Sequence, residues 1–532
     1  MGKKAVVLIS LILCLIFSQN AFAVRSGGTF VFCAPYGGDV FSLDMHRTSN
    51  TQDYIVGLNI NRSLYKWDTA TNLPVLDLAT AVTPSADGLV YTYTLRKDVK
   101  FHNGRTLIAD DIIYSYNRIM KPETASSGAM YIKGVKGAAA VQDGSAKAIS
   151  GLKKIDDFTL EITLDHVTEP GYLFYKAETS IVPKEEVDAR GNGFGTHPVG
   201  CGPFKFVKWV KGSEIVLEKF DGYFEAGKPY LDRVIYKIMP EGSARDMAFR
   251  AKELDANLVG SAQYAVYQQD PEIQNNMIEV AEMYTRHIGF NPHYKPFTDK
   301  RVRQAFNQAL NSELIIKKLL KGKAFKATSF LPSSSPAFDP DLAPYEYNLA
   351  KARALMKEAG YENGFTVEII GTNSQSYGVR VVEAIIPFLK KINIKVVPQQ
   401  LEGGMLAQRL KKGDYQAYIW SIESGPNPLA AATRFDSKTL PSSGNYIQYN
   451  NAQYDKLLAM ARATMDPVER MSYVKAADAV LHEDAPIWFF NYNKAIIAYQ
   501  PWVHGIEPVA PEMMFQDFTN LWIEASSPRA NK

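Results

Sequence analysis

The side chains that could carry out chemistry are scattered along this chain, and their spacing matches no common catalytic motif. The sequence contains neither a Gly-x-Ser-x-Gly nucleophile motif nor a His-Glu-x-x-His zinc motif. Its carboxylate pairs, Asp110-Asp111 and Asp156-Asp157, are adjacent in sequence, so the two members cannot share one face of a helix. The first pair is better placed to begin a helix, where its charge complements the helix dipole. We therefore do not expect an enzyme.

Histidine and cysteine, the usual ligands of transition metals, are also dispersed. The chain has no Cys-x-x-Cys motif, so neither a redox dithiol nor a thiolate zinc site is indicated. For Cys33 and Cys201 we expect partly buried free thiols, with a disulfide as the alternative. We predict no metal site and no cofactor. No two histidines stand three or four residues apart. The eight histidines of the chain are His46, His102, His166, His197, His287, His293, His482 and His504.

The N-terminus carries the pattern of a secretory signal peptide. Lys3 and Lys4 precede an apolar run, Ala5 to Phe17, that is too short to span a bilayer comfortably. Ala21-Phe22-Ala23 is a small-residue cleavage site, so we expect cleavage after Ala23. An N-terminal membrane anchor is the alternative.

Composition and charge narrow the classes of partner. The chain has 59 Lys plus Arg and 56 Asp plus Glu among 532 residues. A balance this close to neutral gives no reason to expect nucleic acid as a partner. The length is too great for one hydrophobic core, so two or three domains are expected. Aromatic residues make up 12% of the chain, which suits a large buried cleft as well as a large core.

The elements that would position functional groups are clearest between Ala79 and Met120. β-Branched and aromatic residues from Val90 to Leu95 predict a strand. His102-Asn103-Gly104 is a turn signal, and the Asp110-Asp111 pair then opens an amphipathic helix. An edge hairpin that leads into a helix is the generic interpretation. The predicted apolar stripe of this helix consists of Ile112, Ile113, Tyr116 and Ile119.

This region closely resembles the signature of the family 5 extracellular solute-binding proteins, the peptide- and nickel-binding subunits of ABC importers. The matching stretches are YTYTLRKDVKFHNG at residues 91–104 and ADDIIYSYNR at residues 109–118. Later landmarks follow in the family's order: the Pro198–Phe204 turn with Asp221-Gly222-Tyr223, then Ile288–Asn291 and Asp299–Ala305. The resemblance covers nearly all of the chain after the signal peptide.

The resemblance implies a bilobal, periplasmic-binding-protein-like α/β fold of type II, in the large group with three subdomains, with two crossover strands as the hinge. Two lobes joined in this way can rotate with little change in core packing. A ligand that contacts both lobes favours the closed state. The expected boundaries are residues 1–23 for the signal peptide, 24–65, 190–284 and 495–532 for the core of lobe I, 66–189 for an extra subdomain of lobe I, and 285–494 for lobe II.

Local patterns predict several of the supporting elements. We expect a helix from Tyr54 to Tyr65 and a single strand from Asp156 to Leu164. Asp299 and Asp466 should each cap a helix. A buried strand from Tyr415 to Trp420 should be followed by a loop. Further predictions are helices at 349–359 and 381–392 and extended segments at 366–370 and 395–398.

The resemblance also implies which residues face the ligand. Cleft loops would follow the first strand, the strand that ends at Ile370, and Trp420. Trp420 could form a flat apolar wall or be plain core. Glu423 could pair with a substrate ammonium or be a solvated carboxylate, and Tyr377 is equally ambiguous. The candidates are Tyr36, Gly37, Gly38, Asn373, Tyr377, Trp420, Ser421, Glu423, Ser424, Gly425 and Asn427.

The sequence departs from the dipeptide binders of this family at both electrostatic anchors. Those proteins place an aspartate for the peptide amino group in the loop that corresponds to Gly425–Pro428. They place an arginine for the peptide carboxylate after the strand that corresponds to Thr366–Ile370. This chain has Gly-Pro-Asn-Pro in the first position and Ser374-Gln375-Ser376 in the second. A dipeptide ligand is therefore in doubt, and a longer peptide or a non-peptide solute stays open.

The resemblance thus implies a monomeric periplasmic protein that captures a peptide or peptide-like solute and delivers it to an ABC permease and ATPase at the inner membrane. One alternative is a non-peptide solute, such as a metal complex, haem, an amine or a sugar. His287 and His293, near the expected crossover, are then the best metal candidates, although a structural histidine is the more common case. A secreted hydrolase is a distant alternative.

Overall fold

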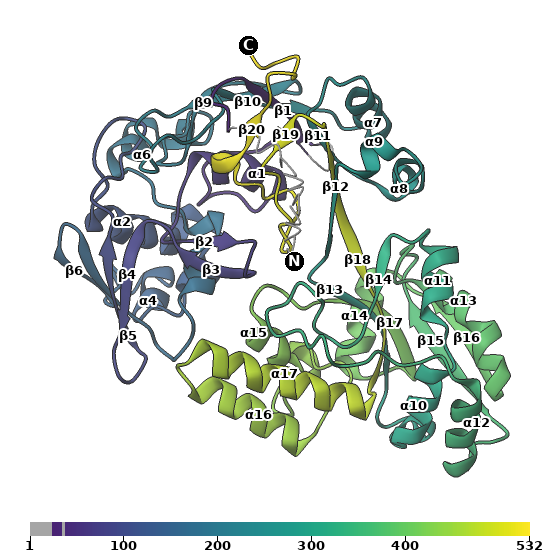
Figure 1. Ribbon diagram of the computed structural model, residues 1–532. Helices are drawn as coiled ribbons and strands as arrows, with labels where there is room; N and C mark the ends of the chain where they lie inside the picture. The colour runs from purple at the N-terminus through teal and green to yellow at the C-terminus, as the bar shows by residue number, and fades with distance from the viewer. Residues whose placement is uncertain (1–23, 35–37, 532) are drawn as a thin grey trace, which may run out of the picture.

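One long mixed sheet runs through both halves of the molecule (Figure 1). The computed structural model describes residues 24–34 and 38–531. The strand order is β16-β15-β17-β13-β18-β11-β1-β10-β9-β8, and β12 and β14 also pair with β18. Because β18 pairs with strands of both halves, the two lobes share one hydrogen-bonded framework. The family-type bilobal α/β fold is confirmed.

Lobe I is built on the half of the sheet that contains the first strand. The C-terminal segment returns to this lobe, where Phe518 lies 5.1 Å from Phe30 and 5.7 Å from Phe32 between ring centroids. The elements are β1 (Thr29–Ala34), α1 (Thr51–Ile60), β8 (Phe204–Val210), β9 (Glu214–Lys219), β10 (Arg233–Ile238), α7 (Gly242–Arg250), β11 (Ala256–Leu258), α8 (Ser261–Tyr267), α9 (Pro271–Gln274), β19 (Val503–His504) and β20 (Trp522–Ile523).

The extra subdomain is a four-stranded antiparallel sheet, β4-β5-β7-β6, covered by α2. The predicted helix start is confirmed: Asp111 accepts the Ile108 N–H at 2.9 Å. Asp110 forms an ion pair with Lys154 at 2.6 Å. The elements are β2 (Tyr65–Asp68), β3 (Leu73–Leu76), β4 (Ala79–Pro84), β5 (Val90–Leu95), α2 (Ala109–Met120), α3 (Ala129–Ile132), α4 (Ala138–Gln142), β6 (Leu152–Asp156), β7 (Thr159–Thr163), α5 (Gly171–Phe174) and α6 (Lys184–Arg190).

Two sequence landmarks meet at the junction between this subdomain and the rest of lobe I. The His102 backbone N–H donates to Gly200 O at 2.8 Å, and the His102 ring contacts Gly202 O at 3.0 Å. The Gly202 N–H in turn donates to Ile60 O at 2.8 Å, at the end of α1. The signature turn and the later glycine-rich turn are therefore docked against each other and against a helix terminus.

Two local predictions for this lobe have wrong bounds. The helix predicted from Tyr54 to Tyr65 ends at Ile60. The Ile60 carbonyl accepts the Gly202 N–H, and Asn61 caps the last turn by donating its side-chain amide to Gly57 O. The strand predicted from Asp156 to Leu164 is β7 (Thr159–Thr163), which begins three residues later than predicted because Asp156 ends β6 and a turn joins the two strands in a hairpin. The turn forms where the Asp156 carboxylate accepts the Phe158 N–H at 2.8 Å.

Lobe II contains the parallel pair β15–β16 and the helices packed around it. The helix caps predicted at Asp299 and Asp466 are confirmed, since both side chains accept backbone N–H groups of the first turn. The elements are α10 (Lys300–Gln308), α11 (Ser312–Leu319), β14 (Ala324–Lys326), α12 (Leu349–Glu358), β15 (Phe365–Gly371), α13 (Val379–Leu389), β16 (Ile394–Gln400), α14 (Gly403–Lys412), β17 (Ala417–Glu423), α15 (Pro428–Ala432), α16 (Ala452–Ala463) and α17 (Pro467–Asp484).

The two lobes are connected by extended strands. β12 (Met277–Ala281) leads into β13 (Tyr284–Phe290), and β18 (Ile487–Tyr499) runs antiparallel to both. The Ile487–Asn491 part of β18 pairs with β13, and the Lys494–Ala498 part pairs with β12. In Figure 1, β12 and β18 are the ribbons that bridge the upper and lower halves. A rotation about these strands can change the angle between the lobes and leave each core intact.

Buried cysteines lie in both the main core and the subdomain core of lobe I. Cys33 and Cys201 belong to separate hydrophobic clusters, and both are thiols, as expected from the sequence. Burial raises the pKa of Cys33 to about 11 and that of Cys201 to about 12. In the part of the chain that the structure describes, no helix combines the length and the apolar character needed to cross a membrane. The predicted signal peptide lies outside the described residues.

Candidate functional site

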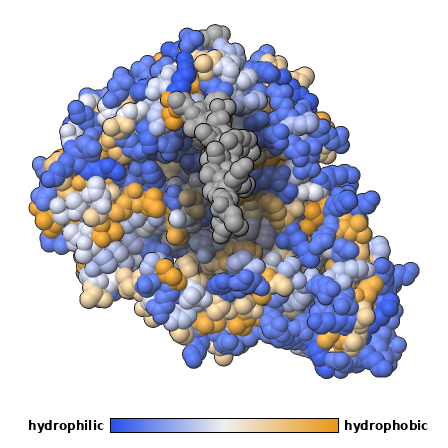
Figure 2. Space-filling model, in the orientation of Figure 1, coloured by the Kyte–Doolittle hydropathy of each residue, from blue (hydrophilic) through white to orange (hydrophobic). Residues whose placement is uncertain are grey.

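The candidate site is a cavity of about 510 Å³ between the lobes, beside the connecting strands. Figure 2 shows the surface hollowed between the upper and lower halves of the molecule. A cavity walled by both lobes is the place where a ligand can influence their relative orientation. Its wall includes Arg245, Asn257 and Val259 from lobe I, Lys323, Tyr377 and Ser421 from lobe II, Tyr284 and Arg286 from the connecting strand β13, Lys494 from β18, and the segment 510–514.

A second cavity, of about 480 Å³, adjoins the first along Tyr377. Its wall includes Asn373 and Trp420, and the Trp420 and Tyr377 rings meet edge to face with centroids 6.2 Å apart. Ser421 lines the first cavity and Trp420 the second, because neighbouring residues of a strand face opposite sides of the sheet. Four of the sequence candidates therefore line these two connected hollows.

The loop predicted after Trp420 begins three residues later than expected. β17 continues to Glu423, because this stretch pairs with β13: Glu423 lies opposite Tyr284 and Ser421 opposite Arg286. A partner strand more than a hundred residues away in sequence decides where this strand ends. Ser421 and Glu423 consequently have fixed strand positions on one face of the ladder.

The remaining candidates of this segment differ in their surroundings. Ser424 is buried, and its hydroxyl has no hydrogen-bond partner within the described residues. Gly425 has φ +60° and donates its N–H to Met283 O at 3.3 Å, so it serves the turn that follows β17. Asn427 caps α15 by accepting the Ala430 N–H at 3.1 Å.

The candidates after the first strand are only partly described. Gly38 lies beside the side-chain amide of Gln52 in α1. Tyr36 and Gly37 lie outside the described residues.

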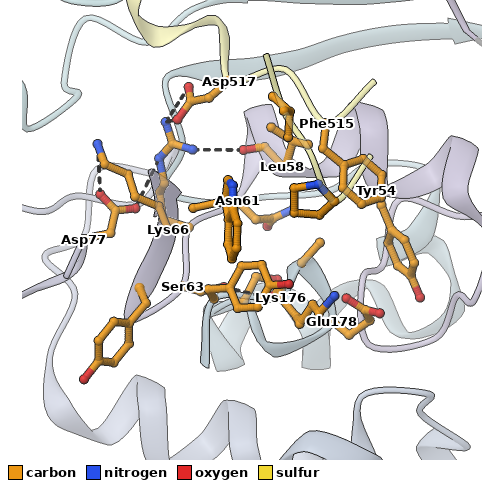
Figure 3. Close-up of a pocket in the computed structure, with 18 of the residues that line it drawn as sticks. Tyr54, Leu58, Asn61, Ser63, Lys66, Asp77, Lys176, Glu178, Phe515 and Asp517 are labelled. Atoms are coloured by element: carbon orange, nitrogen blue, oxygen red, sulfur yellow. Dashed lines mark hydrogen bonds and ion pairs between the residues drawn. The ribbon is translucent and has the colours of Figure 1, made fainter. Parts of the chain in front are cut away.

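Sequence reasoning missed a third cavity, of about 270 Å³, inside lobe I (Figure 3). Pro511 borders both this pocket and the inter-lobe cavity, so the two hollows adjoin. No motif marks the pocket, because its residues come from α1, from the segment around β2, from residues 175–180 and from the C-terminal tail. Its aromatic lining consists of Tyr54, Tyr65, Trp67, Tyr175 and Phe515.

Charged groups of the lobe I pocket are largely matched with one another. Arg62 pairs with Asp517 at 2.9 Å. Figure 3 shows Asp517 on the side of the pocket opposite Lys176 and Glu178. Burial raises the pKa of Glu178 and of Asp77, even though nearby cations oppose the shift.

Glu423 is exposed at the end of β17. Burial raises the pKa of Tyr131 and Tyr175, and the negative charge of Glu423 adds to the shift at both phenols. The Glu423 carboxylate itself accepts no hydrogen bond from the described residues. It is therefore available to a cation from solution.

The two histidines considered for metal binding have separate surroundings. His287 is buried, with Nδ1 3.3 Å from Thr285 O and Nε2 3.4 Å from the Tyr418 hydroxyl. His293 is exposed, and its Nε2 lies 3.1 Å from the Gln448 amide oxygen. Within residues 24–34 and 38–531, no group of three or more His, Cys, Asp or Glu side chains is placed to hold a metal ion.

Comparison with known proteins agrees with this architecture. The model for bacterial extracellular solute-binding proteins, family 5 Middle, matches residues 74–441. The chain is 29% identical to the dipeptide-binding protein of Escherichia coli (strain K12), over 93% of this chain and 95% of the relative.

Two solved structures have the same fold as this chain but superimpose on it to different degrees. The unliganded open form of the periplasmic murein tripeptide-binding protein MppA gives a TM-score of 0.85 at 24% identity, covering 94% of this chain and 98% of that one. The periplasmic binding protein DppA from Helicobacter pylori, in complex with the peptide STSA, gives a TM-score of 0.65 at 26% identity. That match covers 94% of this chain and 99% of the DppA chain.

Proposed function

Because this chain belongs to the family 5 bacterial extracellular solute-binding proteins, we propose that it captures a peptide or peptide-like solute between its lobes. It then delivers the solute to an ABC permease and ATPase at the inner membrane. The family membership confirms the resemblance given by the sequence. The proposal places the protein in the periplasm after cleavage behind Ala23, and it includes no chemical change to the solute.

The observation that carries the proposal is the inter-lobe cavity of about 510 Å³ beside two connecting strands. A solute held there contacts both lobes, so its binding can shift the equilibrium toward the closed arrangement of the lobes. The higher TM-score with an open, unliganded form than with a peptide complex, 0.85 against 0.65, supports an open starting state. Peptide as the solute class is supported by the names of the relatives.

Closure on binding is the first testable prediction. We expect small-angle scattering of the mature protein to show a smaller radius of gyration after a peptide mixture is added, because the lobes rotate together. Native mass spectrometry of the same sample should show bound masses that match intact peptides. A single non-peptide mass would redirect the solute class, and chemically altered peptides would refute a pure binding role. An unchanged radius with bound solute would argue against closure.

Glu423→Gln is the second testable prediction. Loss of the carboxylate should weaken binding of a solute with a free ammonium by about tenfold, the loss of one charge-assisted hydrogen bond. Thermal stability should not change, because Glu423 is exposed and makes no hydrogen bond within the described residues. Glu362→Gln, at an exposed position between α12 and β15 and away from the cavities described above, is the matched control. Equal affinity of the Glu423 variant and the unmodified protein would remove Glu423 from the site.

A further inference from the structure

We propose that the inter-lobe cavity holds the carboxylate of its solute between Lys323 of lobe II and Arg245 of lobe I, with Arg286 beside them. The inference rests on the proposed function, because it assumes that this cavity is where the solute binds. It adds a specific requirement, which is a free carboxylate on the solute. The sequence alone gave no candidate for such an anchor after the strand that ends at Gly371.

Lys323 is the first observation. It lies between α11 and β14, is only partly exposed, and lines the cavity. Its ammonium makes no hydrogen bond and no ion pair within residues 24–34 and 38–531. Burial lowers the pKa of Lys323, and the neighbouring Arg286 adds to this while Glu282 opposes it. A partly desolvated ammonium that lacks a partner in the open structure is a group that an incoming anion would satisfy.

Arg245 is the second observation, and it comes from the opposite lobe. It stands in α7 and lines the same cavity. One guanidinium nitrogen donates to the backbone oxygens of Met239 and Pro240, both at 2.7 Å. The structure gives Arg245 no ion pair with a described carboxylate, so its charge is positioned by backbone groups and left unneutralised.

Arg286 completes the group on the β13 strand. Its side chain is 8% exposed, and Nη2 pairs with Glu282 at 2.7 Å. The Arg286 Nε atom is buried and has no hydrogen-bond partner within the described residues. A buried donor without an acceptor costs free energy. A carboxylate oxygen in the cavity would supply the missing acceptor.

The charge balance of the cavity favours an anion. Two of its cations are each matched by a glutamate, since Arg286 pairs with Glu282 and Lys494 pairs with Glu279, both at 2.7 Å. Arg245 and Lys323 have no such match. The wall therefore stays electropositive even when Glu512, which also lines it, is counted. Because Lys323 and Arg286 are partly or largely shielded from solvent, this excess is felt more strongly than on an open surface.

The arrangement also suits a short zwitterion. Ser421 and Glu423 are two residues apart on β17, about 7 Å, and Ser421 lies opposite Arg286 in the ladder. One face of the β13–β17 ladder thus offers an acid for an ammonium and, one step along, a basic group for a carboxylate. Because Lys323 and Arg245 come from opposite lobes, both can hold one carboxylate only when the lobes approach. The anion would therefore favour closure.

The test compares a free acid with its amide. Isothermal titration of the mature protein would use trialanine and its C-terminal amide, with alanine peptides of two, four and five residues as a length series. We expect trialanine to bind at least tenfold more tightly than its amide. Lys323→Gln should weaken binding of the acid by about 10- to 100-fold, the loss of a charge-assisted hydrogen bond, and should leave binding of the amide unchanged.

Two further variants test whether the loss of affinity is specific to the proposed carboxylate site. Arg245→Gln should reproduce the loss for the acid and should also reduce the closure seen by scattering. Lys326→Gln, three residues away on β14 where Lys326 pairs with Glu313 at 3.3 Å, should have no effect. If the acid and the amide bind equally and Lys323→Gln changes neither, the carboxylate site is refuted and the proposed function stands. If no peptide of the series binds the unmodified protein and native mass spectrometry finds no bound solute, the proposed function itself is refuted.

Discussion

Between pH 6.5 and pH 4, the folded protein is expected to lose several kcal/mol of its free energy of unfolding. Burial lowers the pKa of three histidines, His46, His102 and His287, from 6.5 to about 4. For each ring, a shift of this size corresponds to roughly 3 kcal/mol of preference for the neutral form. These residues lie in both lobes, so the loss should affect the whole molecule.

The local geometry explains why these rings resist protonation. In each, one nitrogen donates to a backbone oxygen: His46 to Ser180, His102 to Gly202 and His287 to Thr285. The other nitrogen faces a donor, which is Arg118 Nη1 for His46, the Gly200 N–H for His102 and the Tyr418 hydroxyl for His287. For His46 and His102, a second proton would therefore meet a donor and no acceptor, in addition to losing hydration. For His287 the Tyr418 hydroxyl could accept that proton, so loss of hydration is the main cause.

The direction of the pH effect follows from proton binding in the two states. Between pH 6.5 and 4 the unfolded chain binds protons at these histidines and the folded chain does not, so stability falls as the pH falls. The contribution is complete above pH 6.5 and is lost as the pH passes through about 4. Asp478 acts in the opposite direction, because burial raises its pKa from 3.8 to about 6. Its contribution is present below pH 3.8 and is lost as the pH rises through 6. Burial also raises the pKa of Asp53, Asp77, Glu178 and Glu507, which act in the same direction as Asp478, and it lowers the pKa of His482, which adds to the other histidines. The net loss of stability should therefore be smaller than the sum of the histidine contributions.

Urea unfolding at pH 7, 6, 5 and 4 would measure the effect. The midpoint should fall most steeply between pH 6 and pH 4. His102→Gln should reduce that dependence by about one histidine's share, because glutamine can also donate to Gly202 O and accept from the Gly200 N–H. The exposed His293→Gln is the control and should leave the profile unchanged. A midpoint that is constant over this range would contradict the assignment of buried neutral histidines.

Local sequence signals predicted those elements that are stabilised by neighbouring residues. Asp299 and Asp466 cap their helices with their own side chains, so a few adjacent residues contain the whole signal. The same holds for β15, whose apolar pattern matches the predicted strand at 366–370. The family landmarks succeeded for a different reason. His102 and Gly200 are 98 positions apart in sequence and form hydrogen bonds with each other. The family pattern contains both landmarks, but the pattern alone does not show that they are in contact.

The predictions that failed depend on contacts made by distant segments. The extension of β17 to Glu423 is set by pairing with β13, and the end of α1 is set by Gly202. The cationic wall of the cavity has no sequence signal, because Arg245, Arg286 and Lys323 come from a helix, a strand and a turn. Glu423 could be named beforehand as the only acid in its segment, but its relation to lobe I is visible only in three dimensions.

Gly200→Ala should destabilise lobe I by about 3 kcal/mol, the upper range for forced overpacking. A Cβ at this position would lie 2.1 Å from Ile60 O and 2.7 Å from the Asn61 side-chain oxygen. Ile60 O is held by the Gly202 N–H at the end of α1, so the added methyl group must displace the turn or the helix terminus. Either movement also disturbs the two bonds between Gly200 and His102.

Gly193→Ala provides the matched control, because nothing lies within 4 Å of a Cβ built there. Thermal unfolding of both variants at pH 7 should show a large decrease in midpoint for Gly200→Ala and little change for Gly193→Ala. The Gly200 variant should also lose part of its pH dependence, since a displaced turn exposes the His102 ring and lets it accept a proton in the folded state. A destabilised variant with an unchanged pH profile would separate the two roles and show that His102 stays buried independently of Gly200. Equal midpoints for the two variants would mean that the end of α1 can move at little cost, contrary to the docking of both landmarks against it.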